Sequence, residues 1–344
     1  MSTLHYRALV NPAHSTAKAT AIALVGAGNE DARRMVAELN LADTAGISEK
    51  ERNAIIARYA AVSRLLEAGE YKSLLDIGCG YSPRFMACAR SGIDYVGMDL
   101  PVVAEDLQKC AAASEEKHRV FVGGDATNSD TLIRAADMLE GELLISCEGL
   151  LHYLTEDEAE QLIGGIRKVL TRHGGAWATT DFASDSLSVA DDLYGNALPT
   201  WNEDKKLSFL EFHGMKVEKL PAADGASALW RMTADPAFVD VQQGIRQVEN
   251  LTVDYRISGT RMLFMVQGRI DSVSAPVLLS VYDRADTEIS SVTIDATKLE
   301  YISSAGLRTL LIMAKKGPVK IIGASEAVKD IMRTTGFDQI LTVK

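Results

Sequence analysis

The chain has 344 residues, 47% hydrophobic and 24% charged, which is an ordinary globular composition and enough for two or three domains. Its formal net charge of −11 is uneven: residues 251–344 carry 12 Lys and Arg against 10 Asp and Glu, and residues 1–250 carry 24 against 37. The acidic first part argues against a nucleic-acid substrate, since phosphate binding depends on basic surface.

No stretch reaches the ~18 apolar residues that a membrane-spanning helix needs, and the N-terminus lacks the basic start and apolar core of a secretory signal. The four cysteines, Cys79, Cys88, Cys110 and Cys147, show no C-x-x-C spacing, so neither a metal site nor a redox pair is expected. We therefore expect a cytoplasmic protein with reduced thiols that binds no membrane, no metal and no nucleic acid.

Residues 1–70 are predicted to form an N-terminal helical cap. Ser48 and Glu51 have the spacing of a capping box, and an apolar stripe follows as far as Leu66. Such a region either packs on the edge of the following sheet or covers its ligand site. Both interpretations stay open at this stage.

Residues 71–236 alternate apolar strands with helices, as βαβ units do. The strands are predicted at 73–76, 94–99, 119–125, 142–149, 174–181, 214–220 and 229–233, and helices at 155–170 and 207–213. The carboxyl ends carry Asp76, Asp99, Asp125, Glu148 and Asp181. Because ligands of open α/β sheets bind outside this edge, the pattern predicts a Rossmann-like sheet with a ligand site among these acids.

A glycine turn, Gly78-Cys79-Gly80, follows the first strand. Glycine permits positive φ and close approach of a ligand, and the N–H groups at the next helix start are expected to face that ligand. Asp99 lies 19 residues after Gly80, where such sheets place the carboxylate that holds a ribose diol. The third glycine of the dinucleotide fingerprint is missing. The turn, with Asp76 two residues before Gly78, resembles the S-adenosylmethionine (SAM) turn of class I methyltransferases. A nicotinamide enzyme and a turn that binds nothing stay as alternatives.

Three segments, residues 78–84, 95–101 and 148–154, resemble the leucine carboxyl methyltransferase-like O-methyltransferases over roughly residues 50–235. The resemblance implies SAM as cofactor, S-adenosylhomocysteine (SAH) as product, and Arg84 as ligand of the SAM carboxylate. This chain has Ser82-Pro83 where the family has Asp-Thr, and His152 where Met is usual. The family's substrate is therefore not carried over.

The SAM interpretation gives each strand end a role. The two glycines of the turn lie close to the amino-acid part of SAM, and Asp99 holds the ribose hydroxyls. Asp125 reaches the adenine amino group, with Ala126 beside the ring, and Glu148 faces the reacting end of SAM. The predicted cofactor-binding residues are Asp76, Gly78, Cys79, Gly80, Arg84, Asp99, Leu100, Asp125, Ala126 and Glu148.

The candidate catalytic residues are Glu148, His152 and Tyr153, which follow the fourth strand. A carboxylate acceptor needs no base, whereas a hydroxyl acceptor can require one. A histidine at this position can equally be a packing residue. The fifth strand is followed by residues that form either a wall of the acceptor site or a solvated loop: Asp181, Asp191, Asp192 and Tyr194.

Residues 237–250 are predicted to be a linking helix or tether, and a second α/β domain is expected at 251–344. Its strands are predicted at 251–257, 262–268, 291–296, 319–323 and 340–343, and its helices at 274–286, 304–316 and 325–335.

The segments 268–271, 292–295 and 301–307 resemble STAS domains of the anti-sigma factor antagonist type. The resemblance implies a module that binds a protein partner and does not catalyse. Ser304 occupies the position that is phosphorylated in some members, although Ser303 replaces the acid that precedes it there. A helix N-terminus partly stabilises a phosphate dianion. The alternative is that Ser304 only caps the helix.

Two functions follow from these patterns. The first is a SAM-dependent O-methyltransferase for a small-molecule or carboxylate acceptor, with a STAS module that docks or regulates it. The alternative is a non-catalytic SAM-binding protein that signals through its STAS domain.

Overall fold

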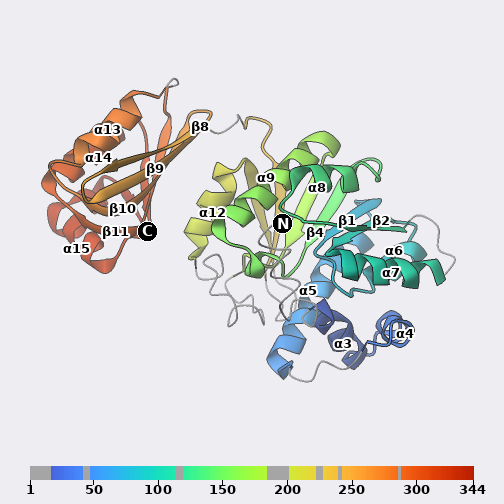
Figure 1. Ribbon diagram of the computed structural model, residues 1–344. Coiled ribbons are helices and arrows are strands. Elements are labelled where there is room, and N and C mark those ends of the chain that lie inside the picture. Colours follow the sequence, from blue (N-terminus) through green and yellow to red (C-terminus); the bar gives the residue numbers. More distant parts are fainter. Residues whose placement is uncertain are drawn as a thin grey trace. The chain divides into compact units, whose positions relative to one another are not determined.

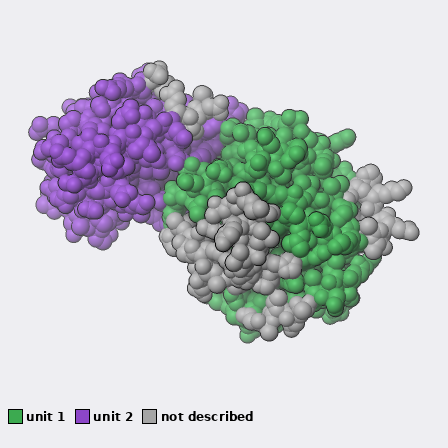
Figure 2. All heavy atoms as spheres, in the orientation of Figure 1, with its two compact units in different colours: residues 1–201, 215–234 green, residues 202–214, 235–344 purple. Residues whose placement is uncertain are grey.

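The computed structural model describes residues 17–41, 47–113, 119–183, 201–221, 228–238, 242–285 and 288–344. The chain divides into two compact units (Figure 2). Unit 1 comprises residues 1–201 and 215–234, and unit 2 comprises residues 202–214 and 235–344. The chain therefore enters unit 2, returns to unit 1 and ends in unit 2.

The first helices in the described part of unit 1 are α3 (Ala19–Gly26), α4 (Glu30–Glu38) and α5 (Glu49–Glu67). The capping box predicted for α5 is confirmed: the Glu51 N–H donates to Ser48 Oγ at 3.2 Å, and the Ser48 N–H donates to Glu51 Oε2 at 2.7 Å. This pairing satisfies two N–H groups that a helix start leaves without partners.

The seven strands of unit 1 form sheet A in the order β3-β2-β1-β4-β5-β7-β6 (Figure 1). They are β1 (Ser73–Ile77), β2 (Asp94–Asp99), β3 (Arg119–Gly123), β4 (Leu143–Cys147), β5 (Gly175–Thr179), β6 (Met215–Leu220) and β7 (Leu229–Ala234). The first five are parallel, and β7 is antiparallel to β5 and β6. The predicted Rossmann-like α/β sheet is confirmed. The order ends in an antiparallel hairpin, unlike the 3-2-1-4-5-6 order of dinucleotide-binding folds.

The parallel strands are connected by helices α6 (Arg84–Arg90), α7 (Pro101–Ala113), α8 (Ser129–Ala136) and α9 (Glu156–His173), with a 3-10 turn η1 (Leu151–Tyr153) after β4. All five residues of β1 and of β4 are buried, as expected of central parallel strands covered on both faces. Their carboxyl ends therefore meet at one edge of sheet A.

Unit 2 contains the six strands of sheet B in the order β13-β12-β11-β10-β9-β8. They are β8 (Gln242–Val248), β9 (Leu251–Ser258), β10 (Arg261–Ile270), β11 (Ser291–Ile302), β12 (Val319–Ile322) and β13 (Thr342–Val343). Helices α13 (Ala275–Asp283), α14 (Ser304–Ala314) and α15 (Glu326–Thr335) lie on one side of sheet B, a 3-10 turn η2 (Phe337–Gln339) precedes β13, and α12 (Glu203–Phe212) also belongs to unit 2 (Figure 1). The predicted second α/β domain is confirmed.

The linking helix predicted at 237–250 is wrong, because Gln242–Val248 is strand β8, which pairs antiparallel with β9. Its polar residues suit an exposed edge strand, and for that reason they gave no apolar alternation. A second difference concerns α12. It starts at Glu203, before the predicted 207, and it belongs to unit 2 although the domain prediction placed all of 71–236 together.

Among the residues that the structure describes, no helix is long and apolar enough to cross a membrane. Within the same ranges, no group of His, Cys, Asp and Glu side chains is arranged to hold a metal ion.

Candidate functional site

The candidate site lies at the carboxyl edge of sheet A, where the strand order reverses between β1 and β4. Both strands are parallel there, and Asp76 is paired in register with Ser146. Open α/β sheets bind ligands at this switch point. The edge gathers the glycine turn, Asp99, the Asp76–Arg84 pair and Glu148.

The N–H groups of the glycine turn donate to acceptors elsewhere in the protein. Gly78 and Gly80 have positive φ angles of 63° and 51°. The N–H groups of Gly78 and Cys79 donate to the Met98 carbonyl at 2.8 and 3.2 Å, and the Tyr81 N–H donates to the Ala17 carbonyl at 3.1 Å. These N–H groups therefore already have acceptors, and the expectation that the N–H groups at the start of α6 face a ligand stays a prediction.

The glycines of the turn also have a packing role. A Cβ added at Gly78 would lie 3.2 Å from the Cβ of Leu150, and one at Gly80 would lie 3.1 Å from the Ala17 carbonyl oxygen. Residues that precede α3 and follow β4 thus contact the turn directly. The N-terminal helical region therefore forms part of the site as well as packing beside it.

The Asp99 side chain is hydrogen-bonded to the glycine turn. Its Oδ2 accepts the Gly80 N–H and its Oδ1 accepts the Leu100 N–H, both at 2.7 Å. Burial raises the pKa of Asp99 to about 6, while the two backbone hydrogen bonds lower it. The carboxylate is ionised at neutral pH, and each oxygen keeps a lone pair for a further hydroxyl donor.

Asp76 and Arg84 form an ion pair beneath the turn. Arg84 Nη1 donates to both Asp76 oxygens at 3.1 Å and to Ser146 Oγ at 3.1 Å, and the Tyr95 hydroxyl donates to Asp76 Oδ2 at 3.1 Å. The Arg84 and Asp76 side chains are only 4% and 2% exposed. Asp76 therefore serves mainly to hold Arg84, whose Nε is buried without a hydrogen-bond partner in the described ranges.

Arg58 of α5 is a site residue that the sequence analysis missed. Its Nη1 is buried and has no hydrogen-bond partner among the residues described. A Cβ on Gly149, directly after Glu148, would lie 3.6 Å from this nitrogen. Arg58 lies three residues after Ile55 and four before Val62, both buried. A charged residue within the apolar stripe of α5 was the signal that could have revealed it.

Glu148 and Asp181 are two acids that lie close together. The Thr180 N–H and hydroxyl donate to Glu148 at 3.2 and 3.0 Å, while Asp181 accepts the Gly149 N–H at 2.7 Å. Burial, followed by the charge of Asp181, raises the pKa of Glu148 to about 8, against the opposing charges of Arg58 and Arg84. At neutral pH most molecules therefore carry a proton on Glu148.

His152 and Tyr153 lie in η1, which follows Glu148 in the chain. The His152 side chain is 1% exposed, and its Nε2 lies 3.9 Å from Asp181 Oδ1, which exceeds hydrogen-bond distance. Tyr153 is half-buried. The burial of His152 fits the packing alternative, and a catalytic role for either residue stays a prediction.

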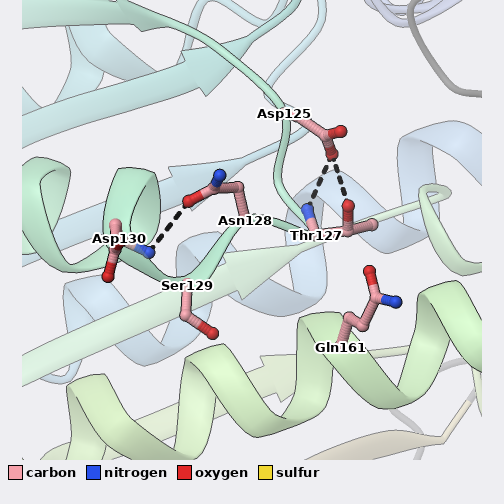
Figure 3. A pocket seen from close by; sticks show the side chains of 6 residues that line it. All are labelled: Asp125, Thr127, Asn128, Ser129, Asp130 and Gln161. Carbon is pink, nitrogen blue, oxygen red and sulfur yellow. Dashed lines mark hydrogen bonds between the residues drawn. The ribbon is translucent and has the colours of Figure 1, made fainter. Parts of the chain in front are cut away.

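Asp125 lies beside a cavity of about 380 Å³ lined by Asp125, Thr127, Asn128, Ser129, Asp130 and Gln161 (Figure 3). Its Oδ1 accepts the N–H and the hydroxyl of Thr127 at 2.9 and 2.7 Å. Gln161 of α9 points towards Thr127, and Ala126 is buried. The cavity therefore adjoins the residues predicted to meet adenine. Asp191, Asp192 and Tyr194 lie outside the described residues.

Ser304 of unit 2 is the first residue of α14, and its N-cap is Ser303, whose Oγ accepts the Gly306 N–H at 3.3 Å. The alternative that Ser304 is itself the cap is therefore wrong. Ser304 is exposed. Its hydroxyl is accessible at a helix N-terminus, and its modification stays a prediction.

Comparisons with known proteins follow the division into two units. Residues 253–342 match the family model described as the Mlab, STAS domain, which confirms the STAS resemblance. A search of curated proteins gives no match to the chain.

Three solved structures illustrate the similarity in fold. A structure of PigF with SAH is 16% identical, covering 54% of this chain and 57% of that one, with a TM-score of 0.40. An O-methyltransferase family protein from Burkholderia thailandensis is 14% identical, covering 54% and 59%, with a TM-score of 0.38. An anti-sigma factor antagonist from Mycobacterium paratuberculosis is 20% identical, covering 30% and 85%, with a TM-score of 0.23. The matches to the first two span less than two thirds of those chains.

Proposed function

We propose that unit 1 binds SAM and transfers its methyl group to an oxygen of a small-molecule or carboxylate acceptor, and that the STAS unit docks or regulates it. One observation carries the proposal. Within the described ranges, Arg58 Nη1 and Arg84 Nε are buried without acceptors near Glu148, at the sheet edge that also carries the glycine turn and Asp99. Buried donors are normally hydrogen-bonded, and an anion is the strongest acceptor for a cationic group. The carboxylate of SAM is an anion of the right kind.

The remaining residues fit the other parts of the cofactor. Asp99 is ionised and has lone pairs left for the vicinal ribose hydroxyls. Asp125 and its cavity suit the amino edge of adenine. Arg58 and Arg84 supply the donors for the carboxylate. The antiparallel end of sheet A and the missing third glycine together disfavour a nicotinamide cofactor.

SAM supplies an activated methyl group, so the protein's task is to align an acceptor oxygen and to exclude water. Glu148 is the residue best placed to take a proton from a hydroxyl acceptor. A cation held beside it lowers its pKa of about 8 and thereby favours the ionised form. A carboxylate acceptor would not need this step.

Calorimetric titration with SAH, beside NADH, tests the cofactor class. We expect micromolar binding of SAH and none of NADH, and Asp99→Ala should weaken SAH binding at least about tenfold. Asp94→Ala, at the amino end of the same strand, is the matched control and should leave the affinity unchanged. Binding of NADH alone, or equal SAH affinity in Asp99→Ala and the parent, would contradict the proposed site.

The non-catalytic alternative is supported by one observation: the side chain of His152, a candidate base, is 1% exposed. In that case unit 1 holds SAM as an effector and the STAS unit signals to a protein partner, with Ser304 as the candidate phosphorylation site. Incubation with methyl-labelled SAM and a panel of hydroxyl and carboxylate acceptors separates the two functions. Label transfer supports the enzyme, and SAH binding without transfer across the panel favours the effector protein. For either function we propose a cytoplasmic location, where the four buried thiols stay reduced.

A further inference from the structure

Sheet B has a second face that its own helices do not cover. Met262, Phe264 and Ile321 belong to the core cluster of unit 2. Side chains alternate along a strand, so Leu263 and Ile322 point to the opposite face. They are nonetheless only 6% and 2% exposed. A second layer must therefore lie over this face.

Helix α12 makes its contacts with the same face. Lys205 Nζ lies 2.9 Å from Asp295 Oδ2, and Lys320 Nζ donates to Ser208 Oγ at 3.0 Å. Asp295 and Lys320 alternate with core residues of β11 and β12, as Leu263 does in β10. Lys205 and Ser208 are three residues apart, so they share one face of the helix. The Lys205 and Asp295 side chains are each 11% exposed, so this pair is largely removed from water.

Both ends of α12 also contact other residues of unit 2. Lys344 Nζ lies 2.6 Å from Asp204 Oδ1 near the first turn. His213 Nε2 lies 3.4 Å from Arg256 Nη1 at the C-cap, and the arginine is the donor. The contacts therefore come from β9, β11, β12 and the residue after β13, and they extend along the whole helix.

The position of α12 in the sequence gives these contacts a consequence. The helix lies between β5 and β6 of sheet A. Asp181, which holds the backbone of the candidate site after β4, directly follows β5 on the same connection. We propose that sheet B docks α12 on its second face and that this docking couples unit 2 to the cofactor edge of sheet A. The docking stands on the contacts above, and the coupling rests on the proposed function.

Charge reversal in the full-length chain tests the proposal. Lys205→Glu and Asp295→Lys each place like charges together, and the double variant restores an opposite pair. Glu300→Lys, on an exposed position of β11, makes the same charge change as Asp295→Lys and serves as control. Two quantities are measured: hydrogen exchange of the α12 amides, and affinity for SAH. We expect each single variant to speed α12 exchange at least about tenfold and to weaken SAH binding about threefold or more, and the double variant to recover most of both.

The outcomes separate the docking from the coupling. Unchanged α12 exchange in both single variants, or a double variant no better than the singles, would overturn the docking. Faster α12 exchange with unchanged SAH affinity would overturn the coupling. Failure of the parent chain to bind SAH would refute the proposed function and the coupling with it, while α12 exchange would still decide the docking. A variant whose unit 2 unfolds also loses protection in β10, whereas loss of the docking alone does not, and Asp295→Asn then provides the milder change.

Discussion

The carboxyl edge of sheet A and the second face of sheet B both bury charged side chains, but they treat them differently. At the edge of sheet A, like groups lie close together: Glu148 lies beside Asp181, and Arg58 and Arg84 each keep a nitrogen without an acceptor among the residues described. On sheet B, Lys205 meets Asp295, and the two side chains are each 11% exposed. The two regions therefore differ in how they surround a buried acid: Asp295 lies beside a lysine, whereas Glu148 lies beside a second acid.

The Asp76–Arg84 pair is the exception at the edge of sheet A, and breaking it should have the largest effect. Asp76→Ala leaves the Arg84 guanidinium buried and unpaired, and we expect a loss of about 3–5 kcal/mol in the free energy of unfolding. All three tryptophans, Trp177, Trp201 and Trp230, lie in unit 1, so urea unfolding followed by their fluorescence reports that unit.

Asp31→Ala is the control for this change. It breaks the pair with Arg90, whose side chain is 61% exposed, and should cost no more than about 1 kcal/mol. Equal effects of the two substitutions would show that the Asp76–Arg84 pair is not structural.

Arg58→Met should affect binding and leave stability almost unchanged. The substitution removes a donor that has no partner within the described chain, so the unfolding midpoint of unit 1 should hardly move. SAH affinity should fall about 10–100-fold, the worth of a hydrogen bond to a charged group. Arg64→Ala, on an exposed position of the same helix, is the control. If Arg58→Met lowers stability and spares affinity, Arg58 is a structural residue.

The raised pKa of Glu148 predicts a pH dependence of ligand binding. The free protein holds a proton on Glu148 below about pH 8, and SAH, whose amino group is cationic, favours the ionised carboxylate. Binding therefore releases a proton, and affinity should rise by up to about tenfold per pH unit between pH 6.5 and 8. Calorimetry in buffers of different ionisation enthalpy measures the proton release. Glu148→Gln should abolish it, and a parent chain that releases no proton would refute the assignment.

The smallest effect concerns α14 of unit 2, where Ser303 and Ser304 are neighbours with different roles. Ser303→Ala removes the cap and should destabilise the first turn by about 1 kcal/mol, whereas Ser304→Ala should change little. Hydrogen exchange of the first amides of α14 measures both. The reverse order would restore Ser304 as the cap.

Local signals in the sequence were sufficient to predict most of the fold. The capping box at Ser48 depends on residues three apart and forms as predicted, and Thr155 forms a second one at the start of the predicted helix 155–170. The strands that end in acids are apolar because sheet A buries both of its faces. β8 was missed because an exposed edge strand needs no apolar alternation, so its polar residues resemble those of a tether.

The candidate site was only partly predictable, because its decisive contacts join distant segments. Asp99 was placed correctly beside the turn by its spacing from Gly80. Arg58 reaches the site through the packing of α5, and nothing near it in the chain indicates the residues after β4. The N–H groups of the turn are used by Met98 and Ala17, which the spacing of glycines does not reveal. The pairing of α12 with sheet B joins residues about 90 positions apart, as Lys205 and Asp295 show.

The path of the chain between the units also sets an order of events during synthesis. Residues 202–214 leave the ribosome before the sheet that holds α12 exists, because most of unit 2 is made from residue 235 onwards. At roughly 5–20 residues per second, sheet B is complete on the order of ten seconds after α12 emerges. During that interval the apolar side chains of Phe209, Leu210 and Phe212, buried in the finished protein, lack their complete surroundings. A nascent chain stalled once α12 has emerged from the ribosome but before sheet B has been made should therefore recruit chaperones at α12, and one stalled after sheet B has emerged should not.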